Sequence, residues 1–237
     1  MENKSGQGIL KNRGVVLRRS DTPEGNRSVY VLLENVGPVW LLAPGAARGK
    51  VRFGGSTDPL VWGTFHVYRG PNRWYLRDVD VRKDFWSLRS SSIRIRQAVH
   101  WVGSILGNTL PGHPCNDLLP VFFWSLSLLE NPSAREDLAS WRFYWRWLRI
   151  WGMAPELERC RSCGSLPRRA VFSGEGINCE KCGGQGIPLS EQERLALLEA
   201  AISGHRDFIE RSGQPGIGSR LVEKCTLVLE RELAERT

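Results

Sequence analysis

The sequence lacks several features that common protein functions require. It has no uninterrupted run of about 20 apolar residues, so we expect no membrane-spanning helix. Its first residues lead into no apolar segment, so we also expect no signal peptide. The glycine-rich stretch at 213–218 lacks the lysine and hydroxyl pair of a phosphate-binding loop, which argues against nucleotide binding.

Candidate catalytic residues are equally scarce. The four histidines are scattered, and none is spaced to pair with a nucleophile or with a second metal ligand. We expect His100 to be packed on a helix face rather than to be catalytic. No cluster of carboxylates suggests a divalent-metal nuclease centre. The sequence therefore predicts a protein that is not an enzyme.

Positive charge is in excess, and it is unevenly spread along the chain. The net charge of the 237 residues is +8. Residues 1–96 hold 17 Lys and Arg against 8 Asp and Glu, whereas residues 97–237 hold 16 against 17. The first part is therefore predicted to bind a polyanion. Nucleic acid is the usual candidate, a membrane surface is the second, and a basic surface that only aids solubility is the remaining alternative.

Five short apolar stretches follow one another in this basic part. Turn residues separate them, and the fourth stretch alternates between apolar and polar side chains as a half-buried strand does. Five strands within about eighty residues favour a small barrel over a sandwich. The predicted strands cover residues 14–18, 28–33, 39–43, 61–68 and 74–81, after a loose tail at residues 1–11.

A glycine-rich basic loop lies between the third and the fourth predicted strand. Arg48, Lys50 and Arg52 alternate in this loop, and the flanking glycines let the backbone approach a phosphate chain. The rings that could stack on bases, or that could instead pack into the core, are Trp62, Trp74 and Tyr75. The residues predicted to contact nucleic acid are Arg18, Arg19, Arg48, Lys50, Arg52, Arg69, Arg73 and Arg77.

The pattern changes to helix after about residue 89, where apolar residues recur at helical spacing. The predicted helices cover residues 93–106, 117–130, 135–151, 190–209 and 220–233. The second is almost wholly apolar and is expected to be central and buried. The fourth opens with a capping box from Ser190 to Glu193.

The third predicted helix carries two different stripes. Aromatic residues from Trp141 to Trp151 form one stripe, which is expected to belong to the core. A row of arginines, Arg142, Arg146 and Arg149, forms the other. We expect this row to be a solvated face, with a grip on an acidic peptide as the alternative.

The most specific pattern in the sequence is a pair of Cys-x-x-Cys motifs, each followed by glycine. A two-residue gap lets two thiolates meet one ion from a tight turn, and four thiolates complete a tetrahedral shell. The spacing predicts one structural zinc ion, with a small hairpin carrying the second pair. The predicted ligands are Cys160, Cys163, Cys179 and Cys182.

Two alternatives remain for these four thiols. Two disulfides would also use four cysteines, but a reducing compartment disfavours them. A redox Cys-x-x-Cys motif is the other alternative, although such a motif is normally single and follows a strand. The remaining cysteines, Cys115 and Cys225, lie in apolar surroundings and are expected to be buried thiols.

Three stretches carry a resemblance to a known family. Residues 14–19 look like its opening strand, and residues 44–60 look like its basic loop leading into the fourth strand. Residues 148–160, with Cys163 and Gly164, look like its helix running into a zinc knuckle. In these stretches and in the order of its parts, the chain resembles the RecO family of bacterial recombination mediators.

The expected fold class is α+β, with an N-terminal five-stranded OB-type β-barrel followed by an α-helical domain that carries a four-cysteine zinc knuckle. Within this fold class we expect four segments. They are the barrel at 1–85, the first helices at 86–158, the knuckle at 159–187 and the C-terminal helices at 188–237.

The resemblance also implies a function. RecO-like proteins bind single- and double-stranded DNA, anneal complementary strands, and act on strands coated by single-strand binding protein, whose acidic C-terminal tail they contact. With RecR they help to load RecA. For this chain the resemblance implies a cytoplasmic, nucleoid-associated protein of DNA repair and recombination, without a membrane partner and without catalytic turnover.

Composition alone leaves other functions open. An RNA- or ribosome-associated OB-fold and zinc-ribbon protein without catalytic activity fits the same charge and cysteine pattern. A nuclease or ligase-like enzyme would need the carboxylate cluster that the sequence does not present. A scaffold whose basic barrel only keeps it soluble is the fourth alternative.

Overall fold

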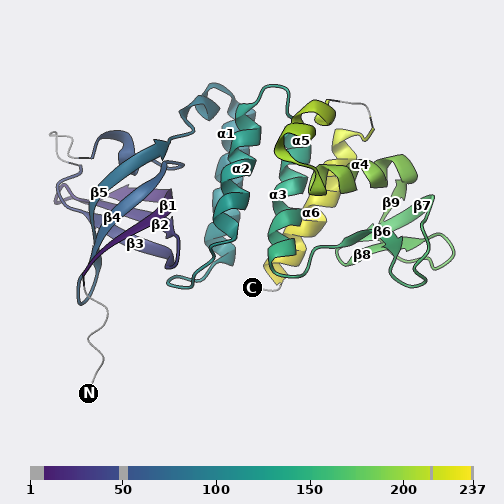
Figure 1. Ribbon diagram of the computed structural model, residues 1–237, viewed down its shortest axis with the longest axis horizontal. Helices are drawn as coiled ribbons and strands as arrows, with labels where there is room; N and C mark the ends of the chain where they lie inside the picture. Colours follow the sequence, from purple (N-terminus) through teal and green to yellow (C-terminus); the bar gives the residue numbers. More distant parts are fainter. Residues whose placement is uncertain (1–7, 48–52, 214–215, 236–237) are drawn as a thin grey trace, which may run out of the picture. The chain divides into compact units, whose positions relative to one another are not determined.

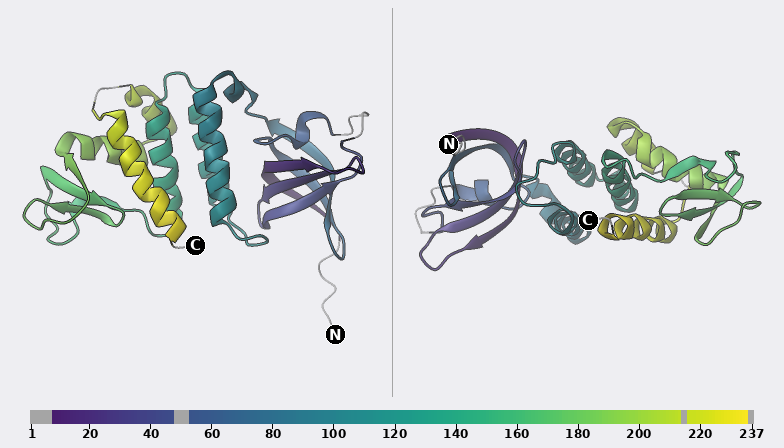
Figure 2. Two further views of the ribbon diagram at one scale, coloured as in Figure 1. Left: turned by 180° about the vertical axis from the view of Figure 1, so that it is seen from behind. Right: turned by 90° about the horizontal axis from the view of Figure 1, so that it is seen from below.

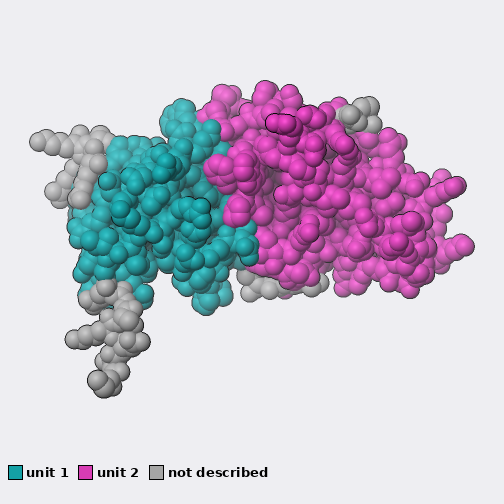
Figure 3. Space-filling model, viewed as in Figure 1, with its two compact units in different colours: residues 1–86, 102–119 teal, residues 87–101, 120–237 magenta. Residues whose placement is uncertain are grey.

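The structure is a computed structural model that describes residues 8–47, 53–213 and 216–235. The chain divides into two compact units, shown in different colours in Figure 3. The first comprises residues 1–86 with 102–119, and the second comprises residues 87–101 with 120–237. In the described ranges, no helix combines the length and the apolar character needed to cross a membrane.

The first unit is built around a closed five-stranded barrel (Figure 1). The strand order is β1-β2-β3-β5-β4, in which all neighbours are antiparallel except β3 and β5. This confirms the predicted OB-type barrel. The strands are β1 (Gly8–Asp21), β2 (Arg27–Leu33), β3 (Gly37–Ala43), β4 (Trp62–Arg69) and β5 (Trp74–Lys83).

Alternation along the strands separates the barrel core from its outer surface. Phe65 and Val67 of β4 are fully buried, whereas His66 between them is only half-buried. Val29 and Val31 of β2 fill the same core. The pattern predicted for the fourth strand is therefore confirmed, because side chains of a strand alternate between its two faces.

The prediction of a loose tail at residues 1–11 is wrong for residues 8–11. Strand β1 begins at Gly8, and its first half pairs with β4 from Gly8 opposite Arg69 to Val15 opposite Trp62. Ile9 is 72% exposed, so no buried side chain marks this half of the strand in the sequence. Backbone hydrogen bonds hold it instead, and any residue except proline can donate them.

The loop after α1 (Ser92–Asn108) packs on the β2–β3 turn of the barrel. The Gly112 N–H donates to the Pro38 carbonyl at 2.9 Å. Gly37 has φ +83°, and a Cβ there would come within 2.0 Å of the His113 carbonyl oxygen, so only glycine fits. Cys115 lies in this loop and is half-buried rather than buried as predicted, yet partial burial still raises its pKa to about 11.

The second unit consists of helices and a small sheet. Figures 1 and 2 both show α6 running along α3, with α4 against α3 as well. The helices, beside α1, are α2 (Leu118–Glu130), α3 (Glu136–Ile150), α4 (Glu191–Ile202), α5 (His205–Ser212) and α6 (Ser219–Glu235). The sheet has the order β6-β8-β7-β9, and its strands are β6 (Glu156–Cys160), β7 (Arg169–Ser173), β8 (Gly176–Cys179) and β9 (Ile187–Ser190).

Aromatic packing around α3 forms the core of this unit. The rings of Trp101 and Phe143 stack with their centres 4.8 Å apart, and the Trp141 indole N–H donates to the Leu197 carbonyl at 2.8 Å. The aromatic stripe is therefore core as predicted, except that Trp151 at its end is 37% exposed.

Several predictions for the helices are corrected. The helix from Ser190 ends at Ile202 rather than near residue 209, and α5 starts anew after Gly204. The apolar α2 is not wholly buried, because Trp124 on its outer face is 51% exposed. His100 is only partly packed: its ring lies edge-on to that of Tyr144, with ring centres 6.4 Å apart, while its side chain is 52% exposed and bonds Glu230 at 3.2 Å. Cys225 is fully buried, which confirms that prediction, and burial raises its pKa to about 12.

The arginine row of α3 is not a solvated face. Arg142 is only 4% exposed, Arg146 is half-buried, and Arg149 alone is exposed. Helical spacing correctly put the three on one stripe, but α4 and α5 pack against part of that stripe. The packing partner decides burial, and spacing within one helix cannot name the partner.

Candidate metal centre and candidate nucleic-acid surface

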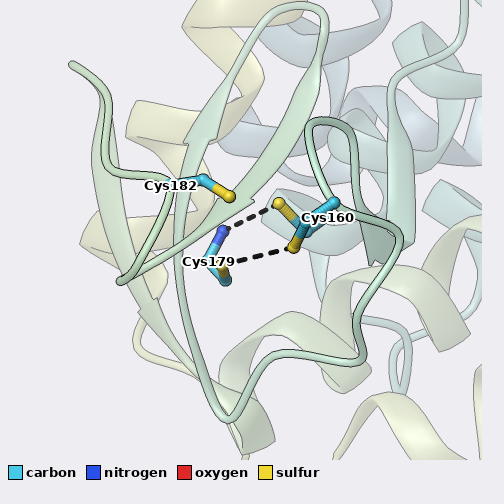
Figure 4. A group of neighbouring side chains, drawn as sticks. Cys160, Cys179 and Cys182 are labelled. Carbon is cyan, nitrogen blue, oxygen red and sulfur yellow. Dashed lines mark hydrogen bonds between the residues drawn. The ribbon is translucent and has the colours of Figure 1, made fainter.

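The four paired cysteines meet at one end of the small sheet. Cys160 ends β6 and Cys179 ends β8, which are parallel neighbours. Cys163 and Cys182 lie in the turns that follow, so each strand supplies one buried thiol and the turn after it supplies one exposed thiol. Figure 4 shows three of these side chains converging. The four Sγ atoms all lie within 4.8 Å of one another.

The two turns repeat the same backbone geometry. Gly164 and Gly183 both have left-handed φ, at +74° and +65°, and their N–H groups donate to the carbonyls of Cys160 and Cys179. Glycine suits both positions, because other residues adopt this φ only with strain. The β7–β8 hairpin carries the second pair, as predicted.

Backbone amides point at the sulfurs. The Cys179 N–H donates to the Cys160 Sγ at 3.3 Å, and this bond is the largest cause that lowers the Cys160 pKa to about 6. The Cys182 thiol lies beside the other sulfurs, and its hydrogen bond with Cys163 contributes most to raising its pKa to about 12. A divalent cation would offset such a rise, since coordination deprotonates a thiol.

These residues fit a zinc ion. Four sulfur donors are the preferred set for a structural zinc site, and two tight turns bring them together without a fifth ligand nearby among the described residues. A closed four-thiolate shell would leave no open position for a reacting water. The centre therefore suits a structural role, with Cys160, Cys163, Cys179 and Cys182 as ligands.

The residues predicted to contact nucleic acid fall into three groups. Arg48, Lys50 and Arg52 lie outside the described residues. Arg18 and Arg19 are exposed on β1, and Arg19 forms an ion pair with Asp58. The third group, Arg69, Arg73 and Arg77, is exposed around the β4–β5 turn.

The β4–β5 hairpin carries cations and aromatic rings together. The Arg69 guanidinium lies 5.3 Å from the ring centre of Trp74, and the Arg77 guanidinium lies 5.3 Å from that of Tyr68. Tyr68 and Tyr75 are cross-strand partners with ring centres 6.3 Å apart. We call this group the hairpin surface; it comprises Tyr68, Arg69, Arg73, Trp74, Tyr75 and Arg77.

The cations of the hairpin surface have no acidic partner among the residues that the structure describes. Within the described ranges, none of Arg69, Arg73 and Arg77 forms an ion pair. Of the rings, Trp74 also packs against the barrel core, while Tyr68 and Tyr75 are half-buried. Tyr68 was not among the rings predicted to stack on bases, although the alternation of β4 places it on the outer face.

The barrel places this hairpin beside the strand that leads to the predicted basic loop. Trp74 and Tyr75 of β5 pair with Leu41 and Leu42 near the end of β3. The residues after β3 are in turn anchored to the β1–β2 turn: the Ala47 N–H donates to the Gly25 carbonyl at 3.2 Å. The surface of an OB barrel that binds oligonucleotides includes the β1–β2 and β4–β5 loops.

Comparison with known proteins gives matches in both units. A family model described as Recombination protein O N terminal matches residues 8–85, and one described as Recombination protein O C terminal matches residues 104–222. A protein of Clostridium novyi named DNA repair protein RecO is 26% identical over 96% of this chain and 89% of its own length. Proteins of the same name from Acetivibrio thermocellus and Bacillus pumilus are 30% and 25% identical, over 73% and 94% of this chain and 68% and 87% of their own lengths.

Proposed function

This chain belongs to the RecO family and so has a role in DNA repair; from that premise we propose that it binds DNA and anneals complementary strands. In this proposal it acts on single strands coated by single-strand binding protein and, with RecR, promotes the loading of RecA. It turns over no substrate. The observation that carries the proposal is the hairpin surface, where three cations without an acidic partner among the described residues lie beside half-buried rings.

The hairpin surface supplies both parts of a single-strand site. Arg69, Arg73 and Arg77 replace counterions along the phosphate chain, which yields affinity without regard to sequence. Tyr68 and Tyr75 offer ring faces on which bases stack, at about 1–3 kcal/mol per base. The guanidinium groups of Arg69 and Arg77 already lie over aromatic rings, at 5.3 Å from the ring centres.

The basic segment with Arg48, Lys50 and Arg52 extends the proposed site. It follows β3, which pairs near its end with the start of β5, the second strand of the hairpin. Six cations would then track one backbone, and two strands attracted to the same positive surface would pair more readily. Arg18 and Arg19 on β1 are the remaining proposed contacts.

The proposed partners follow from the family. Single-strand binding protein would be contacted through its acidic C-terminal tail, and RecR would act together with this chain on the coated strand. Zinc would brace the sheet from which α4 departs and would not touch DNA. A nucleoid-associated protein in the cytoplasm fits this set of partners.

Annealing of coated strands is the direct test. Two complementary oligonucleotides are coated with single-strand binding protein, mixed with the protein with and without RecR, and followed by fluorescence as duplex forms. We expect the protein to accelerate annealing and RecR to modulate it. A protein that left annealing at the spontaneous rate, and bound structured RNA more tightly than single-stranded DNA, would contradict the proposal.

A further inference from the structure

The buried arginines of α3 hold the end of α4. Arg142 donates to the carbonyls of Ala200 and Ser203, each at 2.7 Å, and Arg146 donates to those of Ala201 and Ser203, each at 2.9 Å. These carbonyls belong to the end of α4, where backbone carbonyl groups have no N–H donor within the helix. The acceptors are all uncharged, so the hydrogen-bonding needs of the guanidinium groups are met while their charge is not neutralised by an acid.

Positive charge therefore accumulates at this place. Neither Arg142 nor Arg146 forms an ion pair within the part of the chain that the structure describes. Burial, and then the charge of Arg146, lower the pKa of Arg142 to about 9; burial, and then Arg149, lower that of Arg146. The C-terminal dipole of α4 offsets about half a charge, which is less than two guanidinium groups carry.

Aromatic rings adjoin these charges. His205 opens α5, and burial together with the charges of Arg142 and Arg146 lowers its pKa. Its ring centre lies 5.1 Å from that of Trp124 on α2, which is 51% exposed. We call the set Trp124, Arg142, Arg146, Arg149 and His205 the Trp124 corner, in which the exposed ring and the exposed Arg149 face solvent.

We propose that the Trp124 corner is a second binding site for single-stranded nucleic acid, separate from the hairpin surface. A base would stack on the Trp124 indole, and the adjacent phosphates would lie in the field of the three arginines. The inference rests on the proposed function, because it assigns a site to the second of the two strands that annealing brings together.

An acidic peptide fits this corner less well. A carboxylate is best held by the open fork of a guanidinium, with two parallel hydrogen bonds. The forks of Arg142 and Arg146 are already turned to the end of α4. The positive charge of the two arginines still attracts a polyanion, because this attraction does not require direct hydrogen bonds to the guanidinium groups. The flat indole of Trp124 provides a surface on which a base can stack.

The test compares variants of the exposed members only. The variant carries Trp124→Ala with Arg149→Ala, and the matched control is Leu195→Ala, since Leu195 is 46% exposed on α4 of the same unit. Binding of labelled oligo(dT) is titrated to saturation to count oligonucleotides per chain, and annealing of uncoated complementary strands is then timed. We expect the double variant to lose one class of oligo(dT) site and to anneal about tenfold more slowly.

Other variants and outcomes complete the design. Trp124→Phe should keep part of the annealing rate, because it keeps a ring on which a base can stack. This variant replaces the double variant in the test if a thermal melt shows that the double variant is unstable. Unchanged oligo(dT) stoichiometry and annealing in both variants would overturn the inference. Loss of binding to an acidic peptide, with DNA binding intact, would overturn it in favour of a peptide site.

The failures of the two proposals are distinguishable. If the unaltered protein neither binds oligo(dT) nor anneals strands, the proposed function fails. If the unaltered protein does both and the Trp124 variants match it, only the second site fails.

Discussion

Arginines have different structural roles in the two units. On the barrel, Arg69, Arg73 and Arg77 stand in solvent, two of them over aromatic rings, and within the described residues no acid pairs with them. In the helical unit, Arg142 and Arg146 turn inward and bond backbone carbonyls. The four thiols of the cysteine centre also turn toward one another, with all Sγ atoms within 4.8 Å.

This contrast indicates which cations of a basic protein act in binding and which act in folding. A cation whose hydrogen bonds are already spent on the fold contributes to stability, and its loss leaves buried acceptors unpaired. A cation with free donors over a ring contributes to binding, and its loss costs the fold little. Substitution of an inward-facing group should therefore mainly lower stability, and substitution of an outward-facing cation should mainly lower DNA affinity.

Among the inward-facing groups, we expect changes at the cysteine centre to lower stability most. Cys179→Ser, or removal of metal by a chelator, should lower the thermal midpoint of unfolding strongly, since structural zinc contributes about 10–16 kcal/mol in small zinc modules. In this larger unit we expect a smaller loss. Oligo(dT) affinity measured well below the midpoint should stay within about twofold, because the change acts on the fold alone.

Metal analysis provides the control for that prediction. The unaltered protein should contain about one zinc per chain and the variant less. A variant that stayed fully stable but lost DNA affinity would place the cysteine centre at the DNA interface and would contradict its purely structural role.

The next effect in size belongs to Arg142. Arg142→Ala removes a donor that is 4% exposed and leaves carbonyls at the end of α4 unpaired. We expect the free energy of unfolding, measured by urea denaturation, to fall by about 3 kcal/mol. Arg149→Ala on the same helix is the matched control and should cost less than about 0.5 kcal/mol. Equal costs for the two variants would contradict the distinction between inward and outward arginines.

A smaller effect is expected at the other end of α4. The Ser190 hydroxyl accepts from the Glu193 N–H, and Glu193 bonds back to the Ser190 N–H, forming the predicted capping box. Ser190→Ala should cost about 1 kcal/mol in the same urea experiment. A loss as large as that of Arg142→Ala would mean that the N-terminal cap, rather than the arginines, dominates the anchoring of α4.

The sequence was sufficient where a pattern is local. The alternation of β4, the capping box at Ser190 and the glycines after each cysteine pair each follow from a few neighbouring residues, and the structure confirms them. It was not sufficient where a distant partner decides. The first half of β1 is defined by its backbone pairing with β4, which leaves no hydrophobic signature at Ile9.

The same reason explains the errors at the candidate sites. Gly204 marks the break between α4 and α5, but an isolated glycine is tolerated in helices, so the sequence did not decide it. Arg142 and Arg146 secure the break from another helix, and that contact also buried them against expectation. Counting charges along the sequence located the basic unit. Which rings lie under Arg69 and Arg77 depends on the register between β4 and β5, which the sequence alone did not provide.

The central claim is that outward cations of the barrel carry DNA binding, and the salt dependence of oligo(dT) affinity tests it most directly. Affinity is measured by fluorescence anisotropy from low to moderate salt for the unaltered protein and for the variant with Arg69→Ala, Arg73→Ala and Arg77→Ala. The account predicts weaker binding, unchanged thermal stability, and a log–log salt slope reduced in magnitude by about 2, since each phosphate contact on a single strand contributes about 0.7. An unchanged affinity and slope in a folded variant would contradict it.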